Sequence, residues 1–551
     1  MKAPNYLDIT WFQKKLALAY YKAYTVTMKM AKFELKFQQR IVLFVGLVIF
    51  FLFFQIGIIE GSENPSSFSK PYEIYNIILV FIDTLRADHL NCYGYGRKTS
   101  PNIDKLAEES IVFKNNFTPI TYTLPSFTSI ITSLYPQSHG VLEIFKDRFP
   151  PQIKTLAEIL KMYDYTTAWF GSLESSHLDP EVGFGRGFDV IAEFNNRDLK
   201  KAKKDLTGYI KEHQKDKFFL NFHTYKIHAP YFPSDKYREK FAKYKRKGII
   251  SSRDEYVTAA TNEIRDALIR KEGTIWQILG EDCVSELVSG KIFQGDFDYR
   301  KLVDTSGNKK FKFFQVHDYV YFSKIDLKDM ETKKYIEALY DGEILEFDSE
   351  IIAPLIKQLK RLNIYDKTII IICADHGEEF GEHGGYGHGK TLYKEVTHVP
   401  FIIKVPWMKK GKQIQELIQT VDIMPTLLDL LGIPIPQQAQ GKSLLDLISG
   451  NTNLPVYQYL FGHLQEISFI RAKKWKFILN HETGEKELYN LQLDPGEKHN
   501  LYSEKENFAA GLQSKLKKWE ESLPCYKDKE YSFSLEIDKE TQERIKKTGY
   551  W

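Results

Sequence analysis

The stretch Thr368–Glu379, TIIIICADHGEE, decides the fold class of this chain of 551 residues. An apolar, β-branched run ends abruptly in Asp375 and His376, which Gly377 follows. A short apolar run bounded by polar residues is typical of a strand that is buried on both faces. In open α/β sheets, ligands bind outside the carboxyl ends of such strands, where this acid and this imidazole stand.

A second run of the same kind, Tyr75–Ile82 (YNIILVFI), ends in Asp83. Two buried strands that each deliver a carboxylate at the tip predict one oxygen-rich metal site; two capping acids on unrelated strands are the alternative. From residue 75 to residue 431, strand patterns alternate with helical patterns. This alternation predicts an α/β fold with a doubly wound, mainly parallel sheet between layers of helices.

The segment Ile41–Ile59 is almost wholly apolar and long enough to cross a bilayer as one helix. The 40 residues before it carry eight Lys and Arg against two acidic residues. The positive-inside rule therefore predicts a single-pass protein of the cell membrane, with a cytoplasmic N-terminus and an extracytoplasmic catalytic domain. A buried core helix is the alternative.

The rest of the chain divides by composition. We expect a cytoplasmic basic segment (1–40), a transmembrane helix (41–59), a linker (60–72), a catalytic domain (73–445) with a peripheral insertion at about 240–330, a small C-terminal α+β subdomain (446–523) and a tail (524–551). The net charge of +4 is small for this length and indicates no nucleic-acid partner. No feature of the sequence indicates an oligomeric state.

Three further segments carry polar groups suited to catalysis. In TYTLPSFTSIITSLYP, Thr123 precedes Pro125 and a helical apolar pattern, so it stands at a helix N-terminus, where free N–H groups and the helix dipole favour an anion. The loop HTYKIHAPYFP contains His228. The glycine-rich loop after the DHG sequence offers His388 and Lys390 to a ligand.

Taken together and in order, these segments resemble the sulfatase family of the alkaline phosphatase superfamily, over roughly residues 73–523. The resemblance rests on NIILVFIDTLRADHLNCYG, TLPSFTSIITSLYPQSHGV, GFGRGFD at 183–189, FHTYKIHAPY at 222–231, ADHGEEFGEHGGYGHGKTLY, VDIMPTLLDLLGI and the C-terminal RAKKWKFIL and KELYNLQLDPGEKHNL. It implies an alkaline-phosphatase-like sandwich of helices around a sheet, followed by a small C-terminal sheet and helix.

The chain departs from the family at the nucleophile. Sulfatases carry Cys or Ser in a C/S-x-P-x-R motif and oxidise it to formylglycine; here the aligned residues are Thr123 to Phe127. Threonine cannot form that aldehyde because its Cβ already bears a methyl group, and Phe127 replaces the arginine. The family's Gly-Lys-x-His segment is also absent, with His177 as the one possible survivor. Threonine here is similar to phosphoethanolamine transferases, lipoteichoic acid synthases and nucleotide phosphodiesterases.

The resemblance implies a role for each site residue. The metal ligands are Asp83, Thr123, Asp375 and His376, which suit one or two Zn²⁺, Mn²⁺ or Mg²⁺ ions better than Ca²⁺, since Thr84 replaces the second acid of calcium-bound sulfatases. Thr123 is the expected nucleophile.

Three further residues, His228, His388 and Lys390, are expected to contact the ester or protonate the leaving group. The two histidines are alternatively ligands of a second ion.

We expect lesser roles for the other polar residues. We expect His139, His177 and His383 to be structural. Arg86 and Asp88 shape the entrance of the site or form a surface salt bridge, and Lys226 is a weak candidate for replacing the lost positive charge.

The leading functional hypothesis is a membrane-anchored, metal-dependent hydrolase or transferase that acts on phosphate esters, such as lipid or glycan head groups, through a Thr nucleophile. A sulfatase that works without formylglycine is the second hypothesis. A catalytically inactive binding protein of the same fold is the third.

Overall fold

The computed structural model describes residues 75–142, 147–171, 183–194, 198–271, 320–326, 328–451 and 455–526, together with 273, 275 and 277. The predicted cytoplasmic segment, transmembrane helix and linker, His177, and the tail beyond residue 526 lie outside the described residues. Within the described part of the chain, no helix combines the length and the apolar character that a membrane crossing requires.

An eight-stranded sheet forms the centre of the described chain, in the order β10-β2-β9-β6-β1-β5-β3-β4. Only β9 runs antiparallel to its neighbours, which confirms the mainly parallel sheet predicted from the sequence. The strands are β1 (Asn76–Ile82), β2 (Ile111–Phe117), β3 (Thr166–Gly171), β4 (Val190–Glu193), β5 (Phe218–Thr224), β6 (Thr368–Cys373), β9 (Phe401–Lys404) and β10 (Lys412–Gln419).

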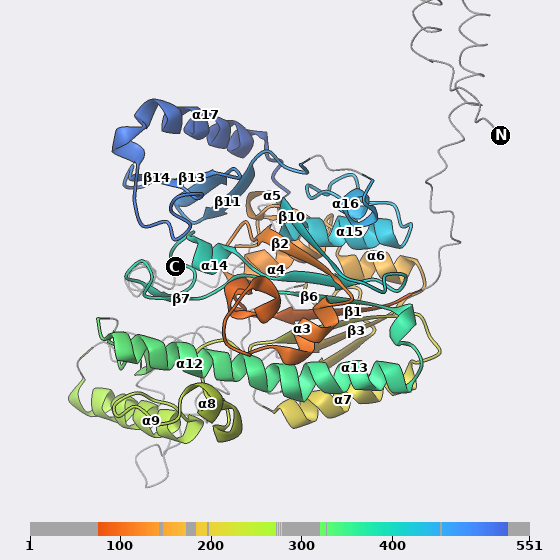
Figure 1. The fold of residues 1–551 in the computed structure, drawn as a ribbon, viewed down its shortest axis with the longest axis horizontal. Helices are drawn as coiled ribbons and strands as arrows, with labels where there is room; N and C mark the ends of the chain where they lie inside the picture. The colour runs from red at the N-terminus through yellow and green to blue at the C-terminus, as the bar shows by residue number, and fades with distance from the viewer. Residues whose placement is uncertain are drawn as a thin grey trace, which may run out of the picture. The chain divides into compact units, whose positions relative to one another are not determined.

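Helices cover both faces of the sheet (Figure 1). Alternate residues of β1 point to opposite faces, so Val80 packs with α3, α7, α12 and α13, whereas Leu79 packs with α4, α6 and α15. These helices are α3 (Pro101–Ala107), α4 (Thr123–Thr132), α6 (Leu156–Met162), α7 (Leu199–Glu212), α12 (Met330–Phe347), α13 (Ala353–Arg361) and α15 (Ile423–Leu430). Burial on both faces explains why β1 and β6 are continuous apolar runs.

Two helices, α12 and α13, precede the DHG strand and are joined by a π-helical turn, Asp348–Ile352. Its Asp348 carboxylate accepts the backbone N–H groups of Asn102 and Ile103 and so caps α3. Burial raises the pKa of Asp348 to about 6. Ser100 precedes α3, but its hydroxyl bonds to the Asp104 side chain and not to the helix backbone.

The segment predicted as a peripheral insertion is described in part. It includes the end of α8 (Asp235–Phe241) and all of α9 (Arg253–Arg270), and α8 packs along α12. Tyr256 and Ile264 of α9 are buried in the same core cluster as α12. The shorter elements are α5 (Pro136–His139), α14 (Lys394–Thr397), α16 (Leu445–Ser449), β7 (Glu379–Phe380) and β8 (Tyr386–Gly387).

The C-terminal part forms an antiparallel sheet covered by one helix, as Figure 1 shows. Ile470 and Phe477 of the sheet pack against Leu516 of the helix. Its elements are β11 (Leu460–Leu464), β12 (Ile467–Arg471), β13 (Trp475–Asn480), β14 (Lys486–Asn490) and α17 (Glu506–Ser522).

A buried ion pair joins this small sheet to the glycine-rich loop. Lys476 Nζ lies 3.0 Å from both carboxylate oxygens of Glu497, and the two side chains are 1% and 0% exposed. Lys476 also donates to the carbonyl of Leu392, and Glu497 accepts the backbone N–H of Lys394. The loop that follows the DHG strand is therefore fixed at its far end by the C-terminal sheet.

Candidate active site and metal centre

The two acids singled out in the sequence meet at one edge of the sheet. β1 and β6 are parallel neighbours, and Phe81 pairs with Cys373 in the register. Asp83 and Asp375 each lie two residues beyond that pair, so both carboxylates emerge at the carboxyl ends of adjacent strands. One oxygen of each acid and one nitrogen of His376 lie within 4.8 Å of one another, and all three residues are fully buried.

The N-terminus of α4 brings Thr123 to this cluster. Its Oγ1 donates to Asp83 Oδ2 at 3.2 Å and lies 3.3 Å from His376 Nε2. Thr123 is the first residue of α4, as expected, and no side chain caps that helix end. The structure thus gathers all four residues of the predicted metal set.

The atoms of this cluster fit a divalent cation. Asp83 Oδ1 and Asp375 Oδ2 are buried and accept no hydrogen bond from the residues that the structure describes; Asp375 Oδ2 lies 3.2 Å from His376 Nε2. Burial together with the Asp375 charge raises the pKa of Asp83. His376 Nδ1 lies 3.0 Å from the carbonyl of Gly377, which can only accept, so the lone pair is on Nε2. Two carboxylates, one imidazole and one hydroxyl suit Zn²⁺, Mn²⁺ or Mg²⁺.

The backbone around the cluster is tightly constrained. Thr84 has φ of 57°, an unfavourable value for a β-branched residue, and its N–H donates to Asp375 Oδ1 at 3.2 Å. Gly377 passes so close to its neighbours that a Cβ there would lie 2.0 Å from the carbonyl oxygen of Glu395. Both positions hold the acids and the imidazole in place.

Two more of the predicted histidines lie beside His376. The rings of His376 and His388 are 4.3 Å apart, and those of His388 and His228 are 5.0 Å apart. His388 Nδ1 lies 2.8 Å from Glu378, which also accepts the Tyr231 hydroxyl at 2.8 Å. The sequence analysis missed Glu378, although it directly follows the DHG sequence.

The cations near the site are engaged elsewhere or exposed. Lys226, the weak candidate for replacing the lost positive charge, forms ion pairs with Glu343 and Glu346 of α12. Lys390 is exposed, and no hydrogen bond or ion pair joins it to the site within the described residues. Arg86 is 4% exposed and forms an ion pair with Asp88, two residues later in the chain.

Phe127, at the position of the family's arginine, is fully buried among aromatic rings. Its ring centroid lies 4.8 Å from that of Phe81 and 5.1 Å from that of Trp169.

Of the histidines expected to be structural, His139 is buried and contacts Ser129, and burial lowers its pKa to about 3. His383 stacks on Tyr393 with ring centroids 3.6 Å apart.

Comparison with known proteins identifies the family. The family model described as Sulfatase matches residues 75–433, and the model described as N-sulphoglucosamine sulphohydrolase, C-terminal, matches residues 381–522. The chain therefore belongs to the sulfatase family, whose members bind a divalent metal ion.

Among curated relatives, the N-acetylglucosamine-6-O-sulfatase of Bacteroides thetaiotaomicron is 24% identical over 497 residues, which are 82% of this chain and 87% of the relative. The arylsulfatase of Clostridium perfringens is 28% identical over 78% of this chain and 91% of the relative.

Solved structures share the fold. A protein solved in complex with its substrate D-glucosamine-2-N,6-O-disulfate superimposes with a TM-score of 0.60 and 20% identity, covering 86% of this chain and 99% of that one. The phosphonate monoester hydrolase of Agrobacterium radiobacter gives a TM-score of 0.57 at 19% identity, covering 81% and 95%. These matches confirm an alkaline-phosphatase-like α/β fold.

Proposed function

We propose that this sulfatase-family protein hydrolyses esters of a tetrahedral oxyanion, with Thr123 as the nucleophile. The observation that carries the proposal is the position of its hydroxyl, 3.2 Å from the Asp83 carboxylate and 3.3 Å from His376 Nε2. A threonine that served only to pack α4 would not need to place its oxygen among buried metal-binding groups.

The start of α4 is suited to the anionic part of the ester. No side-chain cap bonds to the first N–H groups of this ten-residue helix, and the positive end of its dipole lies at Thr123. An ester anion bound there would lie next to the hydroxyl. This supports in-line attack by the Thr123 oxygen on sulfur or phosphorus.

The chain's own residues supply the proton transfers. Asp83 accepts the hydrogen bond of the Thr123 hydroxyl, and His388, oriented by Glu378, would protonate the departing alcohol. A divalent ion held by Asp83, Asp375 and His376 would lower the pKa of the hydroxyl and offset the charge of the ester. Water then releases the acid from Thr123.

We place sulfuric esters first as substrates, because the curated relatives named above are sulfatases. This reverses the ranking made from the sequence. Phosphate esters are the second candidate on one specific observation: Thr123 cannot become formylglycine, and Phe127 offers no cation to a sulfate. Transfer to an acceptor alcohol, the transferase hypothesis, belongs to this second candidate.

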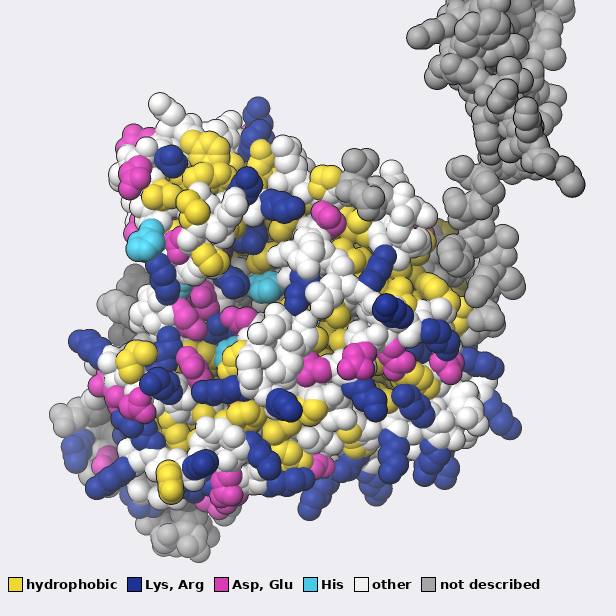
Figure 2. All heavy atoms as spheres, in the orientation of Figure 1, with side chains coloured by type: hydrophobic (Ala, Val, Ile, Leu, Met, Phe, Trp, Pro, Cys, Tyr) yellow, Lys and Arg dark blue, Asp and Glu magenta, His cyan; other side chains and the backbone are white. Residues whose placement is uncertain are grey.

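We further propose that Ile41–Ile59 anchors the protein in the cell membrane, with the catalytic domain outside and lipid or glycan head groups as substrates. Lys and Arg side chains gather along the lower edge of the face shown in Figure 2, and such a basic edge would favour an anionic neighbour. A groove between α7 and α13 is lined by basic side chains: Lys200, Lys203, Lys204, Lys357 and Arg361.

One substrate panel tests the proposal. Full-length protein, loaded with Zn²⁺, Mn²⁺ or Mg²⁺ in turn, is assayed with 4-nitrophenyl sulfate, phosphate, a phosphodiester and a phosphonate. We expect Thr123→Ser to retain part of the activity, because it keeps the hydroxyl, and Thr123→Ala to lose it.

The matched control is Thr128→Ala, which removes a buried hydroxyl from the same helix that bonds to the Leu124 carbonyl. We expect it to keep wild-type activity. Equal rates in wild type and Thr123→Ala would remove the proposed nucleophile, and absence of turnover on every ester would favour the inactive binding protein.

A further inference from the structure

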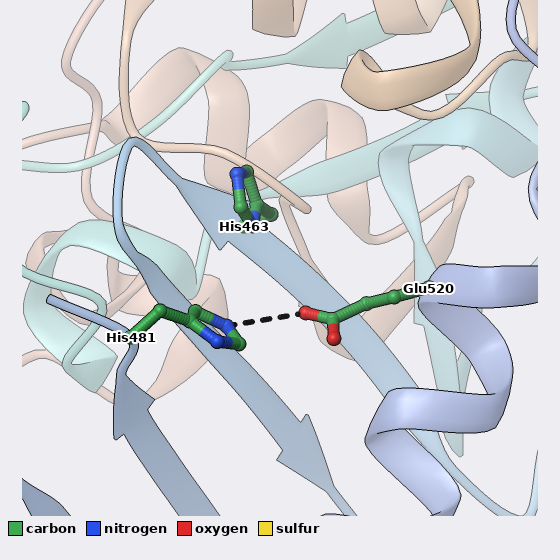
Figure 3. A group of neighbouring side chains, drawn as sticks. All are labelled: His463, His481 and Glu520. Carbon is green, nitrogen blue, oxygen red and sulfur yellow. Dashed lines mark ion pairs between the residues drawn. The ribbon is translucent and has the colours of Figure 1, made fainter. Parts of the chain in front are cut away.

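A second group of metal-binding side chains lies in the C-terminal part, outside the active site. His463 is on β11, His481 directly follows β13 and Glu520 is in the last turn of α17. Figure 3 shows these side chains meeting between the sheet and the helix. One nitrogen of each histidine and one oxygen of Glu520 lie within 4.8 Å of one another.

The hydroxyl of Ser468 marks the point where the three groups converge. Its Oγ lies 2.8 Å from His463 Nδ1, 2.9 Å from His481 Nε2 and 2.6 Å from Glu520 Oε1. His481 Nε2 and Glu520 Oε1 are 3.4 Å apart and form an ion pair when the ring is protonated. Ser468 is fully buried on β12 and pairs with His463 in the antiparallel register.

The location of this cluster follows from the packing of the C-terminal sheet. Ile470 and Leu479 lie on the sheet face that α17 covers, with Leu512 and Leu516 opposite them. Ser468 is two residues from Ile470 on β12, so its side chain points to the same face. The apolar interface between sheet and helix therefore ends in a cluster of two imidazoles and one carboxylate.

We propose that His463, His481 and Glu520 bind a Zn²⁺ ion that joins α17 to the small sheet. Two imidazole nitrogens and one carboxylate oxygen are a ligand set that zinc accepts, with water in the remaining position. The His481 and Glu520 side chains are 33% and 24% exposed, so an ion can reach them from solvent. The ligands come from three separate elements, so binding would oppose separation of α17 from the sheet.

In the metal-free protein the Ser468 hydroxyl holds the same atoms together. Its proton goes to Glu520, and its two lone pairs accept N–H groups from the two rings. Zinc binding requires each imidazole to carry its proton on the other ring nitrogen. The hydroxyl thus pre-orders the ligands without being one of them.

The test uses full-length protein that is stripped with a chelator, reloaded with a zinc salt and dialysed. Zinc per chain is measured by plasma mass spectrometry, and the thermal midpoint is recorded with and without zinc. We expect His481→Gln and Glu520→Gln each to bind one equivalent less than wild type and to lose part of the zinc-dependent rise in midpoint. In a zinc titration, affinity at this site should fall by more than about tenfold, the loss that even outer-sphere changes can cause.

Two controls separate zinc binding from simple hydrogen bonding. His499→Gln replaces an exposed histidine of the same region and should change neither quantity. Ser468→Ala keeps all three ligands and should still bind the extra equivalent. Equal zinc content in wild type, His481→Gln and Glu520→Gln would overturn the proposal and leave a hydrogen-bonded network only.

Because the active-site ligands are unchanged in every variant, ester hydrolysis should persist in all of them. The outcome is therefore independent of the function proposed above.

Discussion

The two buried carboxylates of the active site should weaken the metal-free protein. Asp83 and Asp375 are fully buried, and in the described part of the chain no group donates a hydrogen bond to Asp83 Oδ1 or Asp375 Oδ2. Substituting Asp83→Asn removes one of the two like charges and almost none of the volume. We expect the variant to be more stable than wild type without metal and less stable than wild type with metal.

The magnitude follows from the charge, because asparagine keeps a buried polar group at this position. Leaving a buried polar group unsatisfied costs about 1–3 kcal/mol, and more for a charged group, so metal-free Asp83→Asn should gain the part that is due to the charge, at most about 3 kcal/mol. A ligand present at about a thousand times its Kd stabilises the folded state by about 4 kcal/mol. Wild type should gain most of this from the metal and the variant little, so the order of stability reverses.

Urea denaturation of both proteins, with chelator and with saturating Zn²⁺ or Mn²⁺, measures the four free energies. The control is Asp164→Asn, an exposed acid with φ of 61°, a conformation that asparagine tolerates. It should leave both stabilities and the metal response unchanged. A metal-free Asp83→Asn protein no more stable than wild type, or an equal metal response in both, would refute the reasoning.

Three further predictions concern groups around the site. Glu378→Gln should lower the turnover rate about 10–100-fold, because it removes the charge that orients His388, and the assay is the ester panel with circular dichroism as a folding check. Lys476→Met should lower the free energy of unfolding, measured in urea, by about 3–5 kcal/mol, because Glu497 is left buried without its cation. The double variant Lys476→Met/Glu497→Gln should recover more than half of that loss. A double variant that loses the sum of the two single losses would contradict this. Burial lowers the pKa of His398 from 6.5 to about 4. As the pH falls from about 6.5 towards 4, this imidazole therefore binds a proton in the unfolded chain but not in the folded one, and the folded state loses stability. That loss is at most about 3 kcal/mol and should be smaller in His398→Gln, whereas an identical pH dependence would exclude this contribution.

The central strands could be predicted because burial on both faces leaves continuous apolar runs, as in β1 and β6. The strand β2 could not be predicted in this way. β2 carries Lys114 and Asn116 in its middle, which interrupt the apolar pattern. In the structure these side chains donate to the backbone carbonyls of Cys92 and Val399, so their polar groups are satisfied inside the fold.

That the four residues of the predicted metal set lie together could be predicted, because each acid ends a recognisable strand and Thr123 begins a recognisable helix. Glu378 was missed because a carboxylate next to a motif has no periodicity that separates it from a surface acid. The ion pairs of Lys226 could not be predicted, because its partners, Glu343 and Glu346, lie more than a hundred residues later in the chain. Only the fold brings such residues together.

The role of Thr123 as nucleophile is tested most directly by trapping the group that it would accept. Protein turning over its best ester is quenched in acid within milliseconds, digested, and mapped by mass spectrometry. We expect the acid group of the substrate on the peptide that contains Thr123, and on no peptide of Thr123→Ala. An unmodified peptide from protein in rapid turnover, together with wild-type rates in Thr123→Ala, would contradict the proposed chemistry.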